Sequence, residues 1–144
     1  MLILKAALII FIAMELSNVI IMYFKPDFKY GNSMSTFKQW HKSQQSEPER
    51  LFVKYMVNWV ANCKLIFLTL LTAVLLFGNE TITVWAVIAT IFSISIYFIS
   101  LHPTIKKLDA INQIWPKGYS GTLANTIRIF IAMFALALIL YYVL

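Results

Sequence analysis

The fold is decided by residues 2–24, which read LILKAALIIFIAMELSNVIIMYF. Most of these side chains are apolar, and the run is as long as the roughly 20 residues that a helix needs to cross a hydrocarbon layer about 30 Å thick. Three further stretches of this kind follow, at about residues 55–77, 81–101 and 122–144. Because runs of this length without alternating polar residues fit helices and not barrel strands, the sequence predicts an all-α integral membrane protein with four transmembrane helices.

The composition of the chain indicates the same class. Hydrophobic residues make up 60% of the 144 residues and charged residues 12%, whereas a soluble domain carries about a quarter charged residues. Residues 1–144 are therefore predicted to form a single transmembrane domain. Its one cysteine, Cys63, has no partner for an internal disulfide and is expected to be a small buried apolar side chain.

The basic residues are concentrated in two of the connections, at residues 25–54 and 102–121. They hold nine of the twelve Lys and Arg residues: Lys25, Lys29, Lys38, Lys42, Arg50, Lys54, Lys106, Lys107 and Lys117. The positive-inside rule places both connections in the cytoplasm, with both termini outside (N-out, C-out). The expected location is the bacterial inner membrane or an equivalent membrane. The first stretch is expected to be a retained span and not a cleaved signal peptide, because it exceeds an h-region in length and contains Glu15.

Each cytoplasmic connection is expected to contain an interfacial helix. In the first, Gly31-Asn32-Ser33 breaks the chain, and Ser33 or Ser35 caps a short helix. Its Trp40 ring is expected at headgroup level, with Lys38 and Lys42 toward anionic lipid. The connection ends at Ser46-Glu47-Pro48-Glu49, which has the pattern of a capping box and predicts that the second long helix begins there.

The second connection shows the same features. His102-Pro103 is expected to close the third span, because proline disfavours helix in the residue before it. Ile105, Leu108 and Ile111 then recur at helical spacing, on the side opposite the lysines.

The spans also contain polar residues, which carry the functional signal of the sequence. The expected binding residues are Glu15, Asn18, Asn58, Asn62, Tyr97 and Arg128. Given the topology, they lie in the cytoplasmic half of the bilayer and predict a polar site open to the cytoplasm. A charged group at this depth costs about 2.5–3.5 kcal/mol, so Glu15 needs a partner, a proton or water. Arg128 is the first candidate for an ion-pair partner of Glu15; Lys64 is a second candidate, but it is expected to snorkel. The alternative is that these residues only hold the helices together.

The segment Lys117-Gly118-Tyr119-Ser120 precedes the last span. Lys117 and Ser120 are candidates for an anion or lipid-headgroup site at the start of that helix, and the alternative is a simple loop and cap. The two histidines, His41 and His102, lie in separate connections without other ligands at metal-binding spacing, so no metal or other cofactor is expected. No motif of a known catalytic machinery appears, so no catalytic residues are predicted.

Two family resemblances are limited to parts of the chain. Residues 12–24, with Glu15, resemble the first helix of small multidrug-resistance transporters, which implies a membrane glutamate that exchanges protons for cationic drugs. Lys54 with Asn58, Arg128 and the N-out layout are similar to the membrane-associated proteins of eicosanoid and glutathione metabolism, which implies a trimeric four-helix bundle. Ala61 stands where the second-span motif of that family has a glutamate.

These observations support three functional hypotheses. The first is transport or ligand binding at a polar intramembrane site that accepts an ion, a proton or an amphipathic ligand. The alternative is a non-catalytic accessory subunit of a larger membrane complex, which Ala132, Ala135 and Ala137 in the last span favour because small residues allow close helix packing. The third is an enzyme acting on a lipid. The expected partners are the lipid bilayer, anionic headgroups and further copies of the chain or other membrane subunits, and no nucleic acid.

Overall fold

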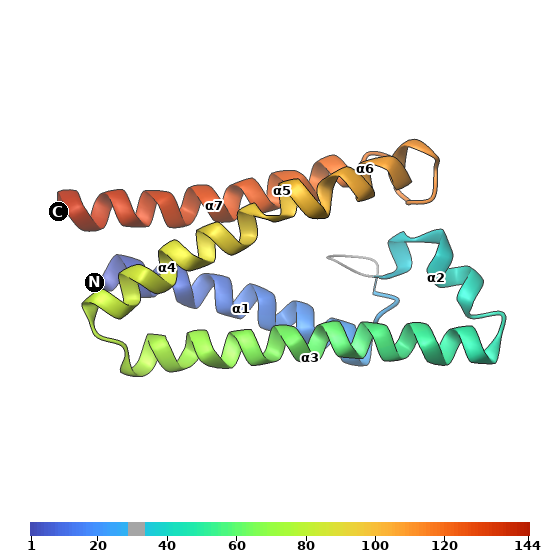
Figure 1. Ribbon diagram of the computed structural model, residues 1–144, viewed down its shortest axis with the longest axis horizontal. Helices are drawn as coiled ribbons and strands as arrows, with labels where there is room; N and C mark the ends of the chain where they lie inside the picture. Colours follow the sequence, from blue (N-terminus) through green and yellow to red (C-terminus); the bar gives the residue numbers. More distant parts are fainter. Residues whose placement is uncertain (29–33) are drawn as a thin grey trace.

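The computed structural model describes residues 1–28 and 34–144, and this part of the chain forms helices with no β-strand (Figure 1). Its elements are α1 (Leu2–Phe24), the 3₁₀ turn η1 (Met34–Thr36), α2 (Lys38–Ser43), α3 (Glu47–Phe77), α4 (Glu80–Ser95), α5 (Tyr97–Ser100), α6 (His102–Ala110) and α7 (Tyr119–Val143). The expected break at Gly31-Asn32-Ser33, the capping role of Ser33 and the basic residue Lys29 lie outside the described residues.

Four helical segments within the described residues are long and apolar enough to cross a membrane. They are Leu2–Phe24, Glu47–Phe77, Glu80–Ala110 and Tyr119–Val143. The all-helical architecture with four candidate spans, predicted from the sequence, is therefore confirmed at this level. Within such a bundle, packing and interhelical polar contacts, and not burial from water, hold the helices together.

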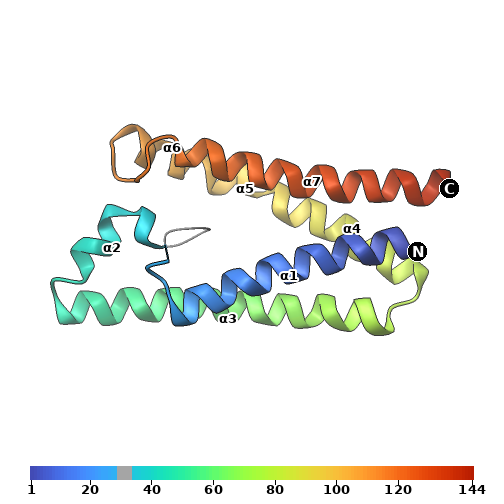
Figure 2. The same ribbon diagram turned by 180° about the vertical axis from the view of Figure 1, so that it is seen from behind.

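The ends of the bundle differ in what they contain. Figures 1 and 2 show both termini and the turn between α3 and α4 at one end, which we call the terminal end, with α2 and the far end of α6 at the other, the connection end. The two termini therefore emerge together, as four antiparallel spans require. The side of the membrane that each end faces remains a proposal, which rests on the basic residues of the connection end.

This arrangement predicts the outcome of reporter fusions. Reporters fused at Leu144 and inserted at Ser43 should localise to opposite sides of the membrane, with Ser43 cytoplasmic. A reporter inserted at Asn79, in the turn between α3 and α4, is the control and should report the same side as Leu144. Finding Leu144 and Ser43 on one side would contradict the four-span architecture.

The third long helix is more continuous than the sequence predicts. His102-Pro103 does not end it, because α6 continues the direction of α5 in both views and the Ile105 N–H donates to the Leu101 carbonyl at 3.0 Å. Pro103 lies in the first turn of α6, where a missing N–H does no harm. Residues 102–110 therefore continue the axis of the third candidate span, and their role as an interfacial helix stays a prediction.

The beginning of α3 agrees with the sequence in position but not in chemistry. The helix starts at Glu47, with Ser46 at the N-cap and Pro48 in the first turn, but the Ser46 side chain makes no capping hydrogen bond. In the turn that follows α3, a Cβ on Gly78 would lie 2.4 Å from the Val74 carbonyl oxygen, so this position requires glycine.

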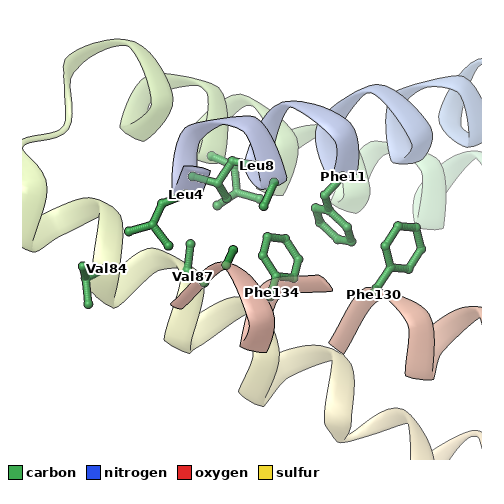
Figure 3. Close-up of a cluster of buried hydrophobic side chains, with 10 residues drawn as sticks. Leu4, Leu8, Phe11, Val84, Val87, Phe130 and Phe134 are labelled. Atoms are coloured by element: carbon green, nitrogen blue, oxygen red, sulfur yellow. The ribbon is translucent and has the colours of Figure 1, made fainter. Parts of the chain in front are cut away.

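The terminal end of the bundle has a tightly packed apolar core formed by α1, α3, α4 and α7 (Figure 3). This terminal-end core consists of Leu4, Ala7, Leu8, Phe11, Leu71, Val84, Val87, Phe130, Phe134 and Ala137. The Phe11 ring meets the rings of Phe130 and Phe134 edge to face, with centroids 5.2 and 5.4 Å apart. Such aromatic pairs contribute about 0.5–1.5 kcal/mol each beyond their buried area.

The connection end has a second core, which α7 does not join. This connection-end core comprises Val19, Met22, Trp40, Val57, Ala61 and Leu68, from α1, α2 and α3. Trp40 is only 7% exposed, and its indole N–H donates to the Asp27 carboxylate. Its ring thus packs against α1 and α3, and its expected depth at headgroup level stays a prediction. Among the described residues, α1 and α7 thus share a buried apolar core only at the terminal end.

The two connections are joined to each other by backbone hydrogen bonds. The Lys38 N–H donates to the Gln113 carbonyl at 2.9 Å, and the Trp115 N–H donates to the Thr36 carbonyl at 2.8 Å. Phe37 and Ile114 form an isolated antiparallel bridge between them, and Ile114 is buried. This contact ties the α1–α3 half of the bundle to the α6–α7 half at the connection end.

Candidate functional site

A groove of about 370 Å³ lies between α1 and α7, on the connection-end side of the terminal-end core. Its polar lining is Glu15, Ser17 and Asn18 from α1, and Tyr119, Thr122 and Thr126 from α7. Phe130 also lines the groove, and its contact with Phe11 closes the groove toward the terminal end. Met14, Ser17 and Thr122 are exposed, so the groove is open on one side.

Helical spacing explains how these residues come to one place. Met14, Asn18 and Ile21 lie on one stripe of α1, at intervals of four and three residues. Tyr119, Thr122, Thr126 and Phe130 form the matching stripe of α7, at intervals of three and four. Val19 and Met22, on the neighbouring face of α1, pack into the connection-end core with α3. Glu15 therefore lies at the border between the groove and α3.

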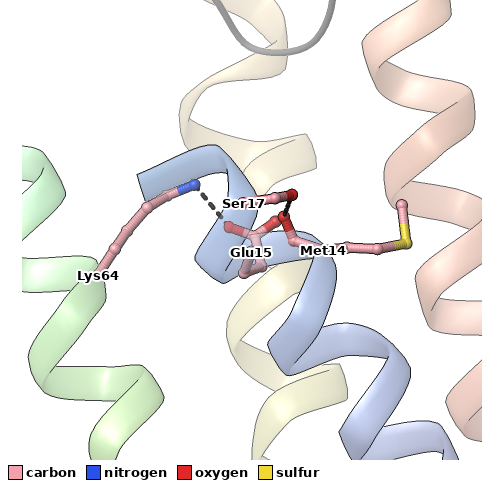
Figure 4. Close-up of polar contacts among 4 residues, drawn as sticks. All are labelled: Met14, Glu15, Ser17 and Lys64. Carbon is pink, nitrogen blue, oxygen red and sulfur yellow. Dashed lines mark hydrogen bonds and ion pairs between the residues drawn. The ribbon is translucent and has the colours of Figure 1, made fainter. Parts of the chain in front are cut away.

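The carboxylate of Glu15 forms an ion pair with Lys64 of α3 (Figure 4). The Lys64 Nζ atom lies 2.6 Å from Glu15 Oε2, and the side chains are 30% and 20% exposed, respectively. Figure 4 shows Lys64 approaching from α3, while Met14 points to the other side, toward α7. The mate of Glu15 is thus Lys64, which we expected to snorkel, and not Arg128.

Arg128 belongs to a different environment. Its guanidinium donates to the Asn125 side-chain oxygen at 2.7 Å and lies over the Phe98 ring, 5.4 Å from the centroid. Tyr97 is buried, and its hydroxyl lies 3.5 Å from Nδ1 of His102. Neither Tyr97 nor Arg128 lines the groove, because both face the contact of α7 with α5 and α6.

The three candidate asparagines are divided among different surroundings. Asn62 on α3 accepts a weak hydrogen bond from the Tyr23 hydroxyl at 3.5 Å, and Asn58 lies one turn earlier, partly buried. Asn18 lines the groove, and its buried Oδ1 atom has no hydrogen-bond partner in the described part of the chain. A buried acceptor without a partner is costly, about 1–3 kcal/mol, which makes Asn18 the polar group most in need of a ligand or water.

The candidate anion site at Lys117 and Ser120 has an internal carboxylate beside it. Asp109 accepts hydrogen bonds from the Gly118 N–H at 2.9 Å, from the Ser120 N–H at 3.1 Å and from the Ser120 hydroxyl at 2.6 Å. These donors are therefore directed to a side chain of the same molecule. Asp109 thereby fixes the start of α7, next to the groove residues Tyr119 and Thr122.

The sequence interpretation missed the contribution of α7 to the groove. Tyr119, Thr122 and Thr126 recur at helical spacing and form a polar stripe, but the expected site residue in this span was the charged Arg128. Ser17 was missed because serine in a membrane helix usually bonds to its own backbone, and its hydroxyl does donate to the Met14 carbonyl, at 2.7 Å.

A second hollow of about 410 Å³ lies on the outer face of α3, where Trp59, Cys63 and Phe67 surround the Lys64 stem. A single helix lines it almost entirely with apolar atoms, so we regard it as open surface and the α1–α7 groove as the site. No group of three or more His, Cys, Asp or Glu side chains suited to a metal ion occurs in residues 1–28 and 34–144.

Comparison of the chain with protein-family models, curated proteins and solved structures finds no match. The two partial family resemblances are therefore not supported, and function is inferred from the groove itself.

Proposed function

We propose that this protein is a multi-pass protein of the bacterial inner membrane, or of an equivalent membrane, and that its α1–α7 groove binds an ion, a proton or an amphipathic ligand. The role is transport or ligand binding from the cytoplasmic side. The orientation follows from the exposed lysines Lys38, Lys42, Lys106 and Lys107 at the connection end, which also suit contact with anionic headgroups.

One observation carries this proposal: six polar side chains from two helices line one groove within two candidate spans. Polar groups are costly at membrane depth and are usually placed toward protein partners or water-filled space. Among the described residues, Glu15 is paired with a cation, Lys64, on the side of α3 but not on the side of the groove. The Asn18 Oδ1 atom accepts no hydrogen bond from these residues. An occupant of the groove would satisfy both.

The size and opening of the groove favour a small organic ligand. Ligand pockets usually measure about 300–1,000 Å³ and combine apolar walls with a few polar groups. The groove has this character, because apolar residues such as Ile21 and Leu123 lie among the polar ones. Its open side would admit the tail of an amphipathic molecule from the hydrocarbon layer.

The accessory-subunit alternative has less structural support. Of the three alanines that favour it, Ala137 is buried in the terminal-end core and Ala135 is partly buried, which leaves only Ala132 exposed for a partner helix. Association with further copies of the chain or with another subunit stays a prediction, and so does an enzymatic role on a lipid.

The proposal is tested by filling the groove. Thr126→Leu adds bulk inside it, and Thr69→Leu makes the same change on the exposed face of α3; both hydroxyls donate to their own helix, to the Thr122 and Ile66 carbonyls. Cationic, neutral and anionic amphiphiles with one chain length are added to protein purified in uncharged detergent. We expect the cationic class to raise the melting temperature of wild type and Thr69→Leu by about 3–5 °C, and to leave Thr126→Leu unchanged.

Two results would contradict the proposal. One is an equal shift in Thr126→Leu and wild type, which would place binding outside the groove. The other is the absence of a shift with every class of amphiphile, which would rule out an amphipathic ligand of the groove.

A further inference from the structure

The groove presents mainly hydrogen-bond acceptors. Glu15 is a carboxylate and accepts only, and the buried Oδ1 atom of Asn18 awaits a donor. The Ser17 hydroxyl proton is engaged with the Met14 carbonyl at 2.7 Å, and that of Thr126 with the Thr122 carbonyl at 3.2 Å. Both hydroxyl oxygens are then left with acceptor capacity. The donors of the lining are the side-chain NH2 group of Asn18 and the hydroxyls of Tyr119 and Thr122, and the last two can also accept.

The charge of the lining has one sign. Glu15 is the only charged residue that lines the groove, and no Lys, Arg or His does so among the described residues. Lys64 reaches Glu15 from α3, on the opposite side of α1 from the groove. Since a carboxylate has two oxygens and about four lone-pair positions, it can accept from Lys64 and from a second donor in the groove at the same time.

We propose that the ligand of this groove is an amphiphile with a protonated primary amine as its head. A primary ammonium has three N–H donors and no acceptor, which complements the carboxylate of Glu15 and the Oδ1 atom of Asn18. Its alkyl chain lies along the apolar lining and leaves through the open side. An anionic head would meet Glu15 without a compensating cation in the groove, and a quaternary ammonium would supply charge but no donor. This inference rests on the proposed function and narrows it to one chemical class.

The test compares two amphiphiles with the same chain and charge: one has a primary ammonium head with three N–H donors, and the other has a bulkier trimethylammonium head with none. Dodecylamine and dodecyltrimethylammonium share chain length and charge, so their partitioning into uncharged micelles is similar, and Thr126→Leu supplies the baseline without a groove. Dissociation constants are measured by calorimetric titration of the full chain. We expect wild type and Thr69→Leu to bind dodecylamine about tenfold more tightly than dodecyltrimethylammonium, because two additional hydrogen bonds of ordinary strength give a preference of this size.

Variants of Asn18 test whether its side-chain oxygen accepts a hydrogen bond from the ammonium group of dodecylamine. Asn18→Leu has the same branched shape and number of side-chain heavy atoms but no acceptor, and the preference for dodecylamine should fall below about threefold. Asn18→Asp keeps acceptor oxygens at the same place and should retain it. These variants also carry the test if Thr126→Leu does not fold, which size-exclusion chromatography would reveal.

The possible failures are distinguishable. If both ligands bind equally in wild type and both are lost in Thr126→Leu, the groove binds amphiphilic cations and the primary-amine inference is wrong. If neither ligand binds wild type more tightly than Thr126→Leu and the Asn18 variants, the primary-amine inference is wrong, and so is the part of the proposed function that gives the groove a cationic amphiphile as its ligand.

Discussion

Replacing Glu15 with glutamine is expected to lower the free energy of unfolding by about 2–3 kcal/mol, measured by denaturant titration in mixed micelles. The change removes the charge that Lys64 contacts at 2.6 Å and leaves an ammonium inside the bundle without a counter-ion. Breaking a fully buried ion pair costs about 3–5 kcal/mol. We expect less here, because the two side chains are 20% and 30% exposed and the stranded lysine can turn toward the surface.

A double-mutant cycle separates the pair from the general effect of each change. Lys64→Met alone should also lower the free energy of unfolding. The double variant Glu15→Gln with Lys64→Met removes both charges, and its loss of unfolding free energy should be smaller than the sum of the two single losses by about 1–2 kcal/mol. Arg128→Gln is the matched control, because Arg128 contacts Asn125 and Phe98 instead. Coupling of Glu15 with Arg128, and none with Lys64, would show that the ion pair described above is not the one that stabilises the protein.

The pair also illustrates why the sequence predicted the spans well and the site only in part. Span positions follow from the length of apolar runs, a local property, and α1 occupies residues 2–24 as expected. The mate of Glu15 depends on how α1 and α3 are rotated against each other, which packing of side chains such as Val19 and Ala61 decides. No periodicity within one helix contains that information.

The six polar residues expected to share one site are divided for the same reason. Glu15 and Asn18 line the groove, whereas Arg128 lies on a different stripe of α7 from Thr122 and Thr126. The similar depth of these side chains along the bundle axis was predictable from the order of residues in each span. That they would point toward one common site was not predictable, because adjacent residues on a helix point about 100° apart.

The continuation of α5 into α6 has a comparable explanation. A proline usually ends the helix before it, and His102-Pro103 follows an apolar run, so a boundary was the reasonable prediction. The structure keeps the axis because Pro103 falls in the first turn of α6, after the short break at Leu101, where no intrahelical N–H bond is needed. Asp109, at the other end of α6, was not singled out from the sequence, because its partners Gly118 and Ser120 are nine and eleven residues away in a loop and the next helix.

Removing the carboxylate of Asp109 is expected to lower the free energy of unfolding at least as much as Glu15→Gln does. In Asp109→Ala, the Ser120 hydroxyl and the backbone N–H groups of Gly118 and Ser120 lose their acceptor, and Ser120 is buried. Because hydrogen bonds to a charged group contribute about 1.5–3 kcal/mol and only part of this loss is recovered by water, we expect a destabilisation of about 3 kcal/mol in the same titration.

The same change should reach the groove, because Tyr119 and Thr122 flank Ser120 in the first turn of α7. Amphiphile binding should therefore weaken along with stability. Asp109→Asn keeps one acceptor oxygen and should lose about half as much free energy, and Glu49→Ala, an exposed carboxylate in the first turn of α3, should cost less than about 1 kcal/mol. If Asp109→Ala instead unfolds at the same denaturant concentration as Glu49→Ala, the three hydrogen bonds to Asp109 do not hold α7 in place.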